Sequence, residues 1–478
     1  MKPDKKTRIV IGGGGFAGLY AAQQLDRTLA QRADIEVTLI SSENFILFTP
    51  MLHEVAAGDL SPSDIVNPLR RILRRVKVLE AEIHAIDLTN KKIRCLGGLR
   101  DVELEFDFDH LLLALGAEPN FFNIPGVGDW AVTMKNLADA ALLRNRMVAL
   151  LEEASLHSDE TIQRELLTFV TVGGGFSGAE TTGAINDFLR ETARFYPAIK
   201  QEMIRIILVE GGKHLLPELG EELGRYSEQK LRNRGVEIIN GAFVTSYDGS
   251  TVELNNGRSI PAATVIWTAG AKPSAVIESL PCEKQRGRLL VDECLAVRGF
   301  PGLWAVGDCA AVPDGGGGFY PPTAQHGMRA AIVAAKSIER AIAGDAPMPF
   351  HYKTMGMLAS IGHHSGVAKV FGLKFSGFFA WWMWRSIYLL KLPRLAKKVR
   401  VMTDWTLDLL FGRDIEQMIT LRDIEATARQ IGRVRARRSR ATAQPERNDQ
   451  ALSDSTFAAG STSNLINDSN HLCHSINS

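Results

Sequence analysis

Two short glycine-rich runs have the residue types and spacing that most clearly predict chemistry in this sequence. Residues 13–18 read GGGFAG and residues 173–178 read GGGFSG, and each run follows a short β-branched segment. In the spacing G-x-G-x-x-G, the first glycine makes a tight turn, the second lets backbone N–H groups approach a pyrophosphate, and the third lets a helix pack closely on a strand. The sequence therefore predicts two dinucleotide sites. The glycines of the first fingerprint are Gly13, Gly15 and Gly18, and those of the second are Gly173, Gly175 and Gly178.

The residues that should bind a ribose differ between the two fingerprints. After the second, the apolar segment 206–209 leads directly into Glu210. Its carboxylate would accept from both ribose hydroxyls and repel a 2′-phosphate, so this site is expected to prefer NADH to NADPH. After the first, segment 37–40 is followed by Ser41, and the acid Glu43 comes two residues later. Either Ser41 or Glu43 could bind the ribose there.

The elements that hold the fingerprints also repeat. An apolar strand-like segment ends in ALGAEP at 114–119, and a second one ends in TAGAKP at 268–273. A helical stretch from 137 to about 154 connects the first unit to the second. This similarity indicates an internal repeat of about 155 residues and two similar dinucleotide folds.

Length, charge and cysteine usage narrow the possibilities further. The 478 residues are 45% hydrophobic with a net charge of +1, which allows more than one core and argues against a nucleic-acid binder. The five cysteines show no C-x-x-C and no zinc spacing, so neither a redox dithiol nor a metal site is predicted. The number of cysteines is odd, their spacing is irregular, and no apolar h-region is found at the N-terminus. These features predict reduced thiols, in the cytosol or on the cytoplasmic side of a membrane.

A further motif lies beyond both repeats, at residues 302–310. Its strand-like segment ends in Gly307 and Asp308, and in two-nucleotide flavoproteins a carboxylate at this place accepts a hydrogen bond from the ribityl chain of the flavin. The alternative is an aspartate that only caps a turn. Downstream, Thr323 precedes an Ala-rich segment that ends at Gly344, and is predicted to cap the N-terminus of a helix.

Together these motifs resemble the type II NADH dehydrogenases, the single-subunit NADH:quinone oxidoreductases that do not pump protons. The chain departs from the A-Q-x-A-x-Q pattern of that family at Gly327 and Arg329, and reads Ala-Leu-Gly rather than Ala-Thr-Gly at 114–116. Besides the fingerprints, the resemblance is carried by residues 48–56 (FTPMLHEVA), 178–180 (GAE), 306–308 (VGD) and 322–326 (PTAQH).

The resemblance implies an α/β fold with two Rossmann-like domains. An NADH-binding domain (125–289) would be inserted in an FAD-binding domain (1–124 and 290–348), followed by a helical membrane-associating or dimerisation region (349–428). Hydride would pass from NADH to FAD, and electrons then to a quinone. The implied FAD residues are Gly13, Gly15, Phe16, Ala17, Gly18, Ser41, Thr49, Ile83, Ala114, Gly116, Asp308, Ala324 and Gln325; the implied NADH residues are Gly173, Gly175, Phe176, Ser177, Gly178, Glu180, Glu210, Ala269 and Gly270.

Glu180 and Gln325 are the candidate catalytic residues. Glu180 is expected in the first turn of the helix after the second fingerprint, within reach of the nicotinamide and flavin rings. The alternative is a carboxylate that only offsets the helix dipole, worth about 0.3–1 kcal/mol. A helix that begins near Thr323 would direct its positive end at the pyrimidine edge of the flavin, where negative charge develops on reduction, and Gln325 would orient the flavin or the quinone.

Aromatic residues gather in the C-terminal third. Segment 375–392 holds five of them between 378 and 384, yet Arg385 and Lys391 interrupt it before it reaches the length of a bilayer span. Segment 401–411 is apolar at helical spacing, and four basic residues lie between the two segments. This pattern predicts a monotopic anchor on the cytoplasmic side of the cell membrane, where a quinone could be reached. A homodimer interface or a core helix is the alternative.

Two further segments of the sequence are rich in arginine. Residues 429–440 contain six arginines and precede a polar stretch to residue 478, which together predict a disordered tail (429–478) that could touch anionic lipid. In residues 69–77, basic and apolar residues alternate at helical spacing, which predicts the solvated face of a packed helix.

Other functions would use the same two nucleotide sites. A disulfide reductase is disfavoured by the missing C-x-x-C, and a sulfide:quinone reductase would need a partner for Cys309 at the flavin. A soluble NADH-dependent reductase of a small redox carrier protein fits the two Rossmann-like domains, but has no need of the aromatic C-terminal region. A nucleotide-sensing interaction protein of the apoptosis-inducing-factor type would turn over slowly, whereas a dehydrogenase cycles rapidly with quinone.

Overall fold

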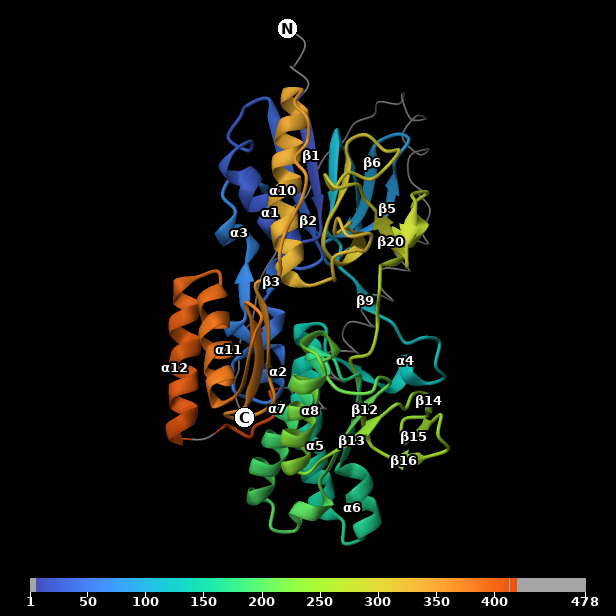
Figure 1. Ribbon diagram of the computed structural model, residues 1–478, viewed down its shortest axis with the longest axis vertical. Helices are drawn as coiled ribbons and strands as arrows, with labels where there is room; N and C mark the ends of the chain where they lie inside the picture. The colour runs from blue at the N-terminus through green and yellow to red at the C-terminus, as the bar shows by residue number, and fades with distance from the viewer. Residues whose placement is uncertain (1–5, 412, 419–478) are drawn as a thin grey trace, which may run out of the picture. The chain divides into compact units, whose positions relative to one another are not determined.

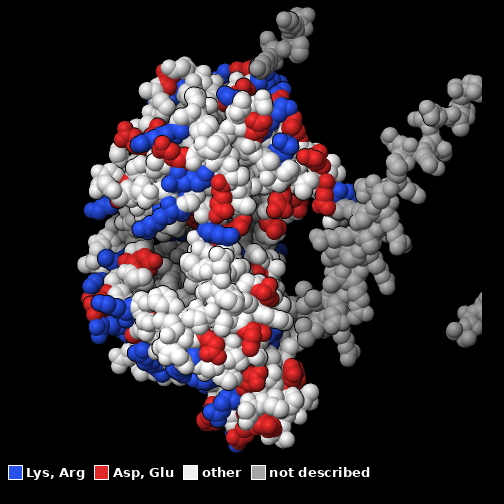
Figure 2. Space-filling view, turned by 90° about the vertical axis from the view of Figure 1, so that its right-hand side faces the viewer, with Lys and Arg blue, Asp and Glu red and all other residues white. Residues whose placement is uncertain are grey.

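The computed structural model describes residues 6–411 and 413–418 of the chain (Figure 1). The six-arginine segment at 429–440, the polar tail after it and Cys473 lie outside the described residues. On the face that Figure 2 shows, basic and acidic side chains are interspersed rather than gathered by sign.

The first fingerprint belongs to a seven-stranded sheet in the order β21-β8-β1-β2-β5-β6-β7. Its first five strands are parallel, whereas β6 and β7 continue the sheet as antiparallel neighbours. Helices α1 and α10 lie side by side on this sheet (Figure 1). The elements are β1 (Thr7–Gly12), α1 (Phe16–Arg27), β2 (Ile35–Ser41), β5 (Lys77–Asp87), β6 (Lys92–Gly97), β7 (Val102–Asp107), β8 (His110–Leu113), β21 (Leu303–Ala305) and α10 (Ala324–Ala343).

The second fingerprint belongs to a five-stranded parallel sheet in the order β10-β17-β11-β12-β13. One apolar face of this sheet packs against α5, α7 and α8, and the other against a small antiparallel sheet, β14-β15-β16. The elements are β10 (Val132–Thr133), α5 (Leu137–Leu156), α6 (Glu160–Leu166), β11 (Thr168–Val172), α7 (Phe176–Thr192), β12 (Arg205–Glu210), α8 (Glu221–Asn233), β13 (Val236–Asn240), β14 (Val244–Tyr247), β15 (Thr251–Leu254), β16 (Ser259–Pro261) and β17 (Thr264–Trp267).

The two sheets repeat one arrangement, which confirms the internal repeat. In each, the strand before the fingerprint lies between the next strand and the last strand of the unit, β1 between β2 and β8, and β11 between β12 and β17. The N–H of Ala114 donates to Gly12 at 2.8 Å, and that of Thr268 donates to Val172 at 2.9 Å. Positions 114 and 268 are therefore equivalent, and the segments that follow β8 and β17 leave their sheets in the same way.

The fingerprint glycines are required by geometry in both copies. Gly13 and Gly173 have φ of +102° and +105°, a region that residues with a Cβ rarely adopt. A Cβ on Gly18 or Gly178 would overlap the carbonyl oxygen of the first glycine, so helix and loop pack too closely for any other residue. The second glycine of each fingerprint has no atom within 4 Å of its would-be Cβ, which leaves open space where a pyrophosphate would lie.

Two connections run between the sheets as an antiparallel pair, β9 (Glu118–Pro119) with β18 (Ala271–Lys272). The polypeptide then returns to the first sheet through β21, which pairs with β8. The remaining short elements are β3 (Phe45–Leu47), α2 (Leu52–Ala56), β4 (Val66–Pro68), α3 (Leu69–Ile72), α4 (Val127–Trp130), α9 (Ala275–Ser279), β19 (Lys284–Gln285), β20 (Arg288–Leu290) and β22 (Ala310–Ala311).

The arginine-rich segment at 69–77 differs from its prediction as a packed helix. Only one helical turn forms, α3, and the strand β5 begins at Lys77. The carboxylate of Asp26 accepts hydrogen bonds from the consecutive backbone N–H groups of residues 74, 75 and 76, at 3.0, 2.6 and 2.9 Å. These bonds stop the helix because they take N–H groups that its next turn would need.

The C-terminal region forms an antiparallel sheet followed by two helices that lie side by side (Figure 1). The predicted apolar segment 375–392 is not one element, since its first residues complete β25. The elements are β23 (Gly356–Ser360), β24 (Gly366–Val370), β25 (Leu373–Gly377), α11 (Phe378–Lys391) and α12 (Leu395–Phe411). Within the described part of the chain, no helix combines the length and the hydropathy that a membrane span requires.

The aromatic residues of α11 divide between the core and the surface. Trp384 is fully buried and Trp381 is 7% exposed, whereas Phe379 and Trp382 are 53% and 54% exposed. The prediction of a single interfacial cluster is therefore wrong for Trp381 and Trp384. One face of this helix belongs to the protein core, and the other faces outward.

We expect Gly178→Ala to lower the stability of the protein in the absence of NADH by about 1–3 kcal/mol, because the new methyl group overlaps the carbonyl of Gly173. Gly175→Ala is the matched control, since Gly175 has φ −70° and open space at its Cβ position. Urea unfolding of the two variants measures the difference. Equal midpoints would contradict the steric argument.

Candidate functional site

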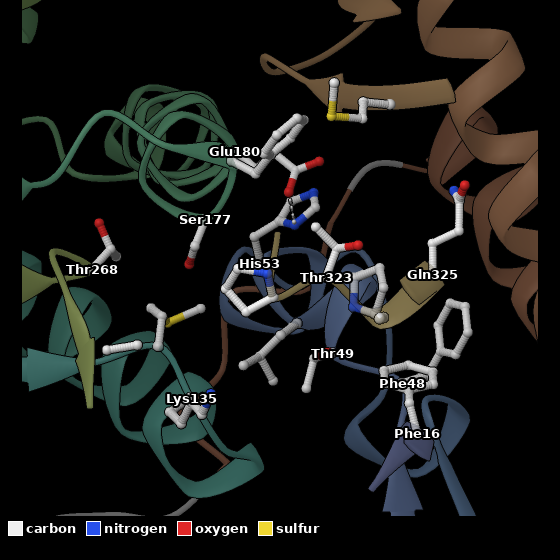
Figure 3. Close-up of a pocket in the computed structure, with 18 of the residues that line it drawn as sticks. Phe16, Phe48, Thr49, His53, Lys135, Ser177, Glu180, Thr268, Thr323 and Gln325 are labelled. Atoms are coloured by element: carbon white, nitrogen blue, oxygen red, sulfur yellow. Dashed lines mark ion pairs between the residues drawn. The ribbon is translucent and has the colours of Figure 1, made fainter. Parts of the chain in front are cut away.

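A cavity of about 690 Å³ lies where the two fingerprint helices and the C-terminal region meet. Figure 3 shows Ser177 and Thr268 on one side of it, Phe16, Phe48 and Gln325 on the other, and Glu180 and His53 between. The cavity is therefore bounded by the start of α1, the start of α7, and residues far along the chain. Its lining includes Phe16, Phe48, Thr49, His53, Lys135, Phe176, Ser177, Glu180, Thr268, Gly270, Thr323, Ala324, Gln325, Tyr388 and Lys391.

Glu180 faces this cavity from α7 and is only 8% exposed. Because α7 begins at Phe176, Glu180 is its fifth residue, so the prediction that it lies in the first helical turn is wrong. Its Oε1 accepts hydrogen bonds from the backbone N–H of Ser360 at 3.1 Å and from the indole N–H of Trp384 at 2.9 Å. Glu180 is thus held by the C-terminal region, and offsetting the helix dipole does not account for its position.

Burial raises the pKa of Glu180 to about 8, and the nearby carboxyl of Glu54 raises it as well, against the lowering effect of its two hydrogen bonds. His53 Nδ1 lies 4.0 Å from Glu180 Oε2. Burial lowers the pKa of His53 to about 4, so this contact joins a neutral imidazole to a neutral acid at pH 7 rather than two ions. The cavity wall therefore holds a carboxylic acid proton at neutral pH.

Glu54, which follows His53 in the sequence, is a second buried acid and connects the site to helix α12. The indole N–H of Trp405 donates to Glu54 Oε2 at 2.8 Å, and Arg385 lies 3.8 Å from Glu54 Oε1. The guanidinium of Arg385 lies between the rings of Trp381 and Trp405, 4.3 and 4.5 Å from their centroids. Burial raises the pKa of Glu54, although Arg385 opposes it.

The start of α10 forms the opposite wall, and Thr323 caps it as predicted. Its hydroxyl accepts from the N–H of His326 at 3.4 Å, and the imidazole Nδ1 of His326 lies 2.7 Å from the same oxygen. Gln325 is fixed at both ends of its amide, since it donates to the carbonyl of Gly356 at 3.2 Å and accepts from the hydroxyl of Tyr352 at 2.8 Å.

Glu210 lies beside the second fingerprint, where the sequence predicts a ribose-binding acid. Its carboxylate accepts from the backbone N–H of Gly174 at 2.5 Å and of Gly212 at 2.6 Å. On the other side of β11, Ala269 and Gly270 follow the end of β17, and Gly270 reaches the cavity. The carboxylate, the phosphate loop and the cavity therefore follow one another along a single edge of the sheet.

Ser41 takes the equivalent position beside the first fingerprint. A Cβ on Gly14 would lie within 3.0 Å of the Ser41 side chain, just as one on Gly174 would meet Glu210. The hydroxyl of Ser41 accepts from the N–H of Glu43 at 3.3 Å, which repeats the bond between Glu210 and Gly212. Of the two candidates for the first ribose, Ser41 therefore stands in the place of Glu210, and Glu43 is exposed.

The other residues implied for FAD lie around the same loop. Ala114 is the residue whose carbonyl Gly13 approaches, Gly116 has φ +70°, and a Cβ on Gly12 would lie 3.0 Å from the Ile83 side chain. Asp308 lies just after β21, outside the cavity lining, and burial raises its pKa against the opposing charges of Lys135 and Arg288. The glycine cradle and the open cavity beside Phe16 fit a bound flavin dinucleotide.

Sequence reasoning missed Trp384 and Tyr388 as residues of the site. Trp384 binds Glu180, and Tyr388 lines the cavity beside Lys391, whose pKa is lowered by burial and by the charge of Arg329. The available signal was the indole N–H of a tryptophan in a partly apolar helix, because a buried indole N–H needs an acceptor. That acceptor is 204 residues away in sequence, so the helix pattern could not identify it.

Comparisons with known proteins agree with this geometry. Residues 7–337 match the pyridine nucleotide-disulphide oxidoreductase family, and residues 354–414 match the NDH2 C-terminal domain. The chain is 34% identical to the type II NADH:quinone oxidoreductase Ndh of Mycobacterium tuberculosis over 90% of its own length and 93% of that protein. It is 31% identical to a type II NADH:quinone oxidoreductase of Staphylococcus aureus, over 79% of this chain and 92% of that one.

Solved structures show the same fold. A structure of NDH2 from Plasmodium falciparum in complex with NADH superimposes with a TM-score of 0.81 at 23% identity, covering 86% of this chain and all of that one. The sulfide:quinone oxidoreductase of Aquifex aeolicus superimposes with a TM-score of 0.64 at 16% identity. The family match over residues 7–337 and a relative 34% identical along 93% of its length show that the chain belongs to the pyridine nucleotide-disulphide oxidoreductases, and among them to the type II NADH:quinone oxidoreductases.

Proposed function

We propose that the chain passes two electrons from NADH through FAD to a membrane quinone, and that the 690 Å³ cavity is where the reacting rings meet. When bound, FAD supplies the carrier chemistry, because it accepts a hydride and can release electrons to a quinone. The observation that carries this proposal is the position of Glu180, on the helix of the second fingerprint, in the cavity wall, and hydrogen-bonded to Trp384 of the C-terminal region.

The two nucleotides are assigned to the two loops by what surrounds each loop. We assign FAD to the first fingerprint, with Ser41, Thr49, Asp308 and the residues around Ala114 and Ala324, and NADH to the second, with Glu210, Ala269 and Gly270. We propose that the FAD-binding domain resumes once the second sheet is complete, because β21 pairs with β8 and because Ile277, Leu280 and Leu289 already pack in the core of the first sheet, ahead of residue 290. Phe16 and Phe176, the first residues of the two fingerprint helices, both reach the cavity.

Glu210 should determine the preference for NADH. We expect Glu210→Gln to lower kcat/KM for NADH by roughly 10- to 100-fold, because charge-assisted hydrogen bonds to the ribose are lost. Activity with NADPH should fall less or rise, since the repulsion of a 2′-phosphate is removed. Steady-state kinetics with both donors test this, and an unchanged ratio of the two kcat/KM values would contradict the assignment.

Glu180 should serve the quinone half of the reaction as a proton donor. Reduction of a quinone to a quinol takes up two electrons and two protons, so a neutral acid in the cavity wall can give a proton to a quinone oxygen. Its hydrogen bonds from Ser360 and Trp384 both go to Oε1, whereas Oε2 lies 4.0 Å from His53 Nδ1 and accepts no hydrogen bond from the described residues. Gln325, fixed by Tyr352 and Gly356, would position the flavin or the quinone.

We expect Glu180→Gln to reduce quinone-dependent turnover at pH 7 by at least about tenfold, since the amide cannot donate a proton and recover it. In the unchanged protein, turnover should fall as the pH rises through about 8, where Glu180 loses its proton, and the variant should lack this decline. In the Glu180→Gln variant, the rate of flavin reduction by NADH in the absence of quinone should change little.

The exposed residue Glu153 supplies the matched control, because Glu153→Gln makes the same change at a residue that does not line the cavity. Stopped-flow spectroscopy separates flavin reduction by NADH from reoxidation by a short-chain quinone. If the Glu180 variant keeps the decline near pH 8, then Glu180 is not the proton donor.

The outward faces of α11 and α12 are proposed as a peripheral, monotopic contact with the cytoplasmic side of the cell membrane. Basic residues between the helices would contact anionic headgroups while apolar side chains enter the interface. A second copy of the chain is the alternative partner of the same face. The exposed apolar residues are Phe378, Phe379, Trp382, Leu390, Leu395, Val399, Met402, Leu407, Leu410 and Phe411.

We expect the double change Phe379→Ser with Trp382→Ser to weaken binding to anionic phospholipid vesicles roughly tenfold or more, because two exposed apolar groups no longer enter the bilayer. Leu156→Ser is the control, as Leu156 is 83% exposed on α5. Substitution is a cleaner test than truncation, since removing α11 would also remove the buried Trp384. Unchanged vesicle binding, or a concentration-dependent dimer lost in the variant, would contradict the membrane assignment.

A further inference from the structure

Phe243 is a solvent-exposed aromatic residue beside the second nucleotide loop. It lies in the chain between β13 and β14 and is 60% exposed, although nearly all residues of the strands around it are at least partly buried. Its ring packs on the backbone of Gly211, where three ring carbons lie within 3.0 Å of a would-be Cβ. Gly211 directly follows Glu210, so the ring stands next to the proposed ribose site.

The backbone at Phe243 is anchored on both sides by hydrogen bonds. The N–H of Phe243 donates to the side chain of Asn255 at 2.8 Å, and the N–H of Asn255 donates to the carbonyl of Phe243 at 2.9 Å. The preceding residues join the loop after β12, since Ala242 donates to Glu210 at 3.3 Å and Gly241 to Gly212 at 3.0 Å. These bonds fix the backbone that carries the ring, and the ring itself lies against Gly211.

The internal repeat gives this position a counterpart. Glu210 pairs with Asn240 on the next strand, and Ser41 pairs with Glu80, so Phe243 and Ile83 each lie three residues beyond equivalent positions. Ile83 is 8% exposed and its side chain packs toward Gly12. Only at the second site does this position present an aromatic face to solvent, beside two glycines that add no side chains.

The order of these groups matches the order of groups in a dinucleotide. The open second glycine of the fingerprint accommodates a pyrophosphate, Glu210 comes next at the ribose, and Phe243 lies beyond it, where a base would be. Aromatic rings bind bases by stacking, since every base has a π face, and a preformed exposed ring loses little entropy on binding. We propose that Phe243 is the adenine platform of the NADH site, an inference that rests on the proposed binding of NADH at the second fingerprint.

The test compares two hydride donors on the holoenzyme. NADH carries the adenosine half, whereas reduced nicotinamide mononucleotide lacks it. Phe243→Ala should raise KM for NADH roughly 5- to 100-fold with kcat little changed, leave KM for the mononucleotide unchanged, and weaken the binding of ADP-ribose by a similar factor in calorimetry. Phe243→Trp should restore NADH binding. Phe195→Ala, at another exposed phenylalanine of the same unit, should change none of these values.

Two results would overturn the inference: an unchanged KM for NADH in the alanine variant, or an equal rise of KM for both donors. An equal rise would show that the variant disturbs the whole site rather than an adenine contact. Failure of the unchanged protein to reduce a quinone with NADH would instead contradict the proposed function, and ADP-ribose binding still decides the role of Phe243 in that case.

Discussion

The contact on which the rest of the site depends is the pair of hydrogen bonds from Trp384 and Ser360 to one carboxyl oxygen of Glu180. It joins the helix of the second nucleotide loop to the C-terminal region, and the carboxyl group it holds is buried. Because the carboxyl is buried, its proton stays bound at neutral pH. The two hydrogen bonds thus join two walls of the cavity and fix the orientation of an acid that burial keeps neutral.

Much of this architecture could be predicted because its signals lie close together in the sequence. A fingerprint, its strand, its helix and the acid at the end of the next strand lie within about 40 residues, and their spacing has a direct steric cause. The cap at Thr323 is equally local. The links of Trp384 to Glu180 and Trp405 to Glu54 span 204 and 351 residues, and no periodic pattern encodes which acid a buried indole will find.

The sequence predictions that the structure contradicts failed for the same reason, namely contacts between residues far apart in the sequence. Asp26 ends the helix predicted at 69–77 from about 50 positions away, through hydrogen bonds that an apolar pattern does not reveal. Tryptophans on one helix suggested a membrane interface, yet Trp384 is buried and Trp382 is not. Hydropathy reports that an aromatic side chain avoids water, and only the fold decides whether protein or lipid covers it.

The buried acids also oppose folding, which argues that they are retained for function. The native pKa of Glu180, about 8, lies above the ordinary value of 4.5, so between these pH values the native state holds a proton that the unfolded chain has released. Stability therefore falls as the pH rises through that window, and burial of Glu54 acts in the same direction. A leucine or glutamine at position 180 would avoid this loss. The protein instead keeps two buried acids and a neutral histidine together beside its cavity, which is the arrangement that the proposed proton donation to a quinone requires.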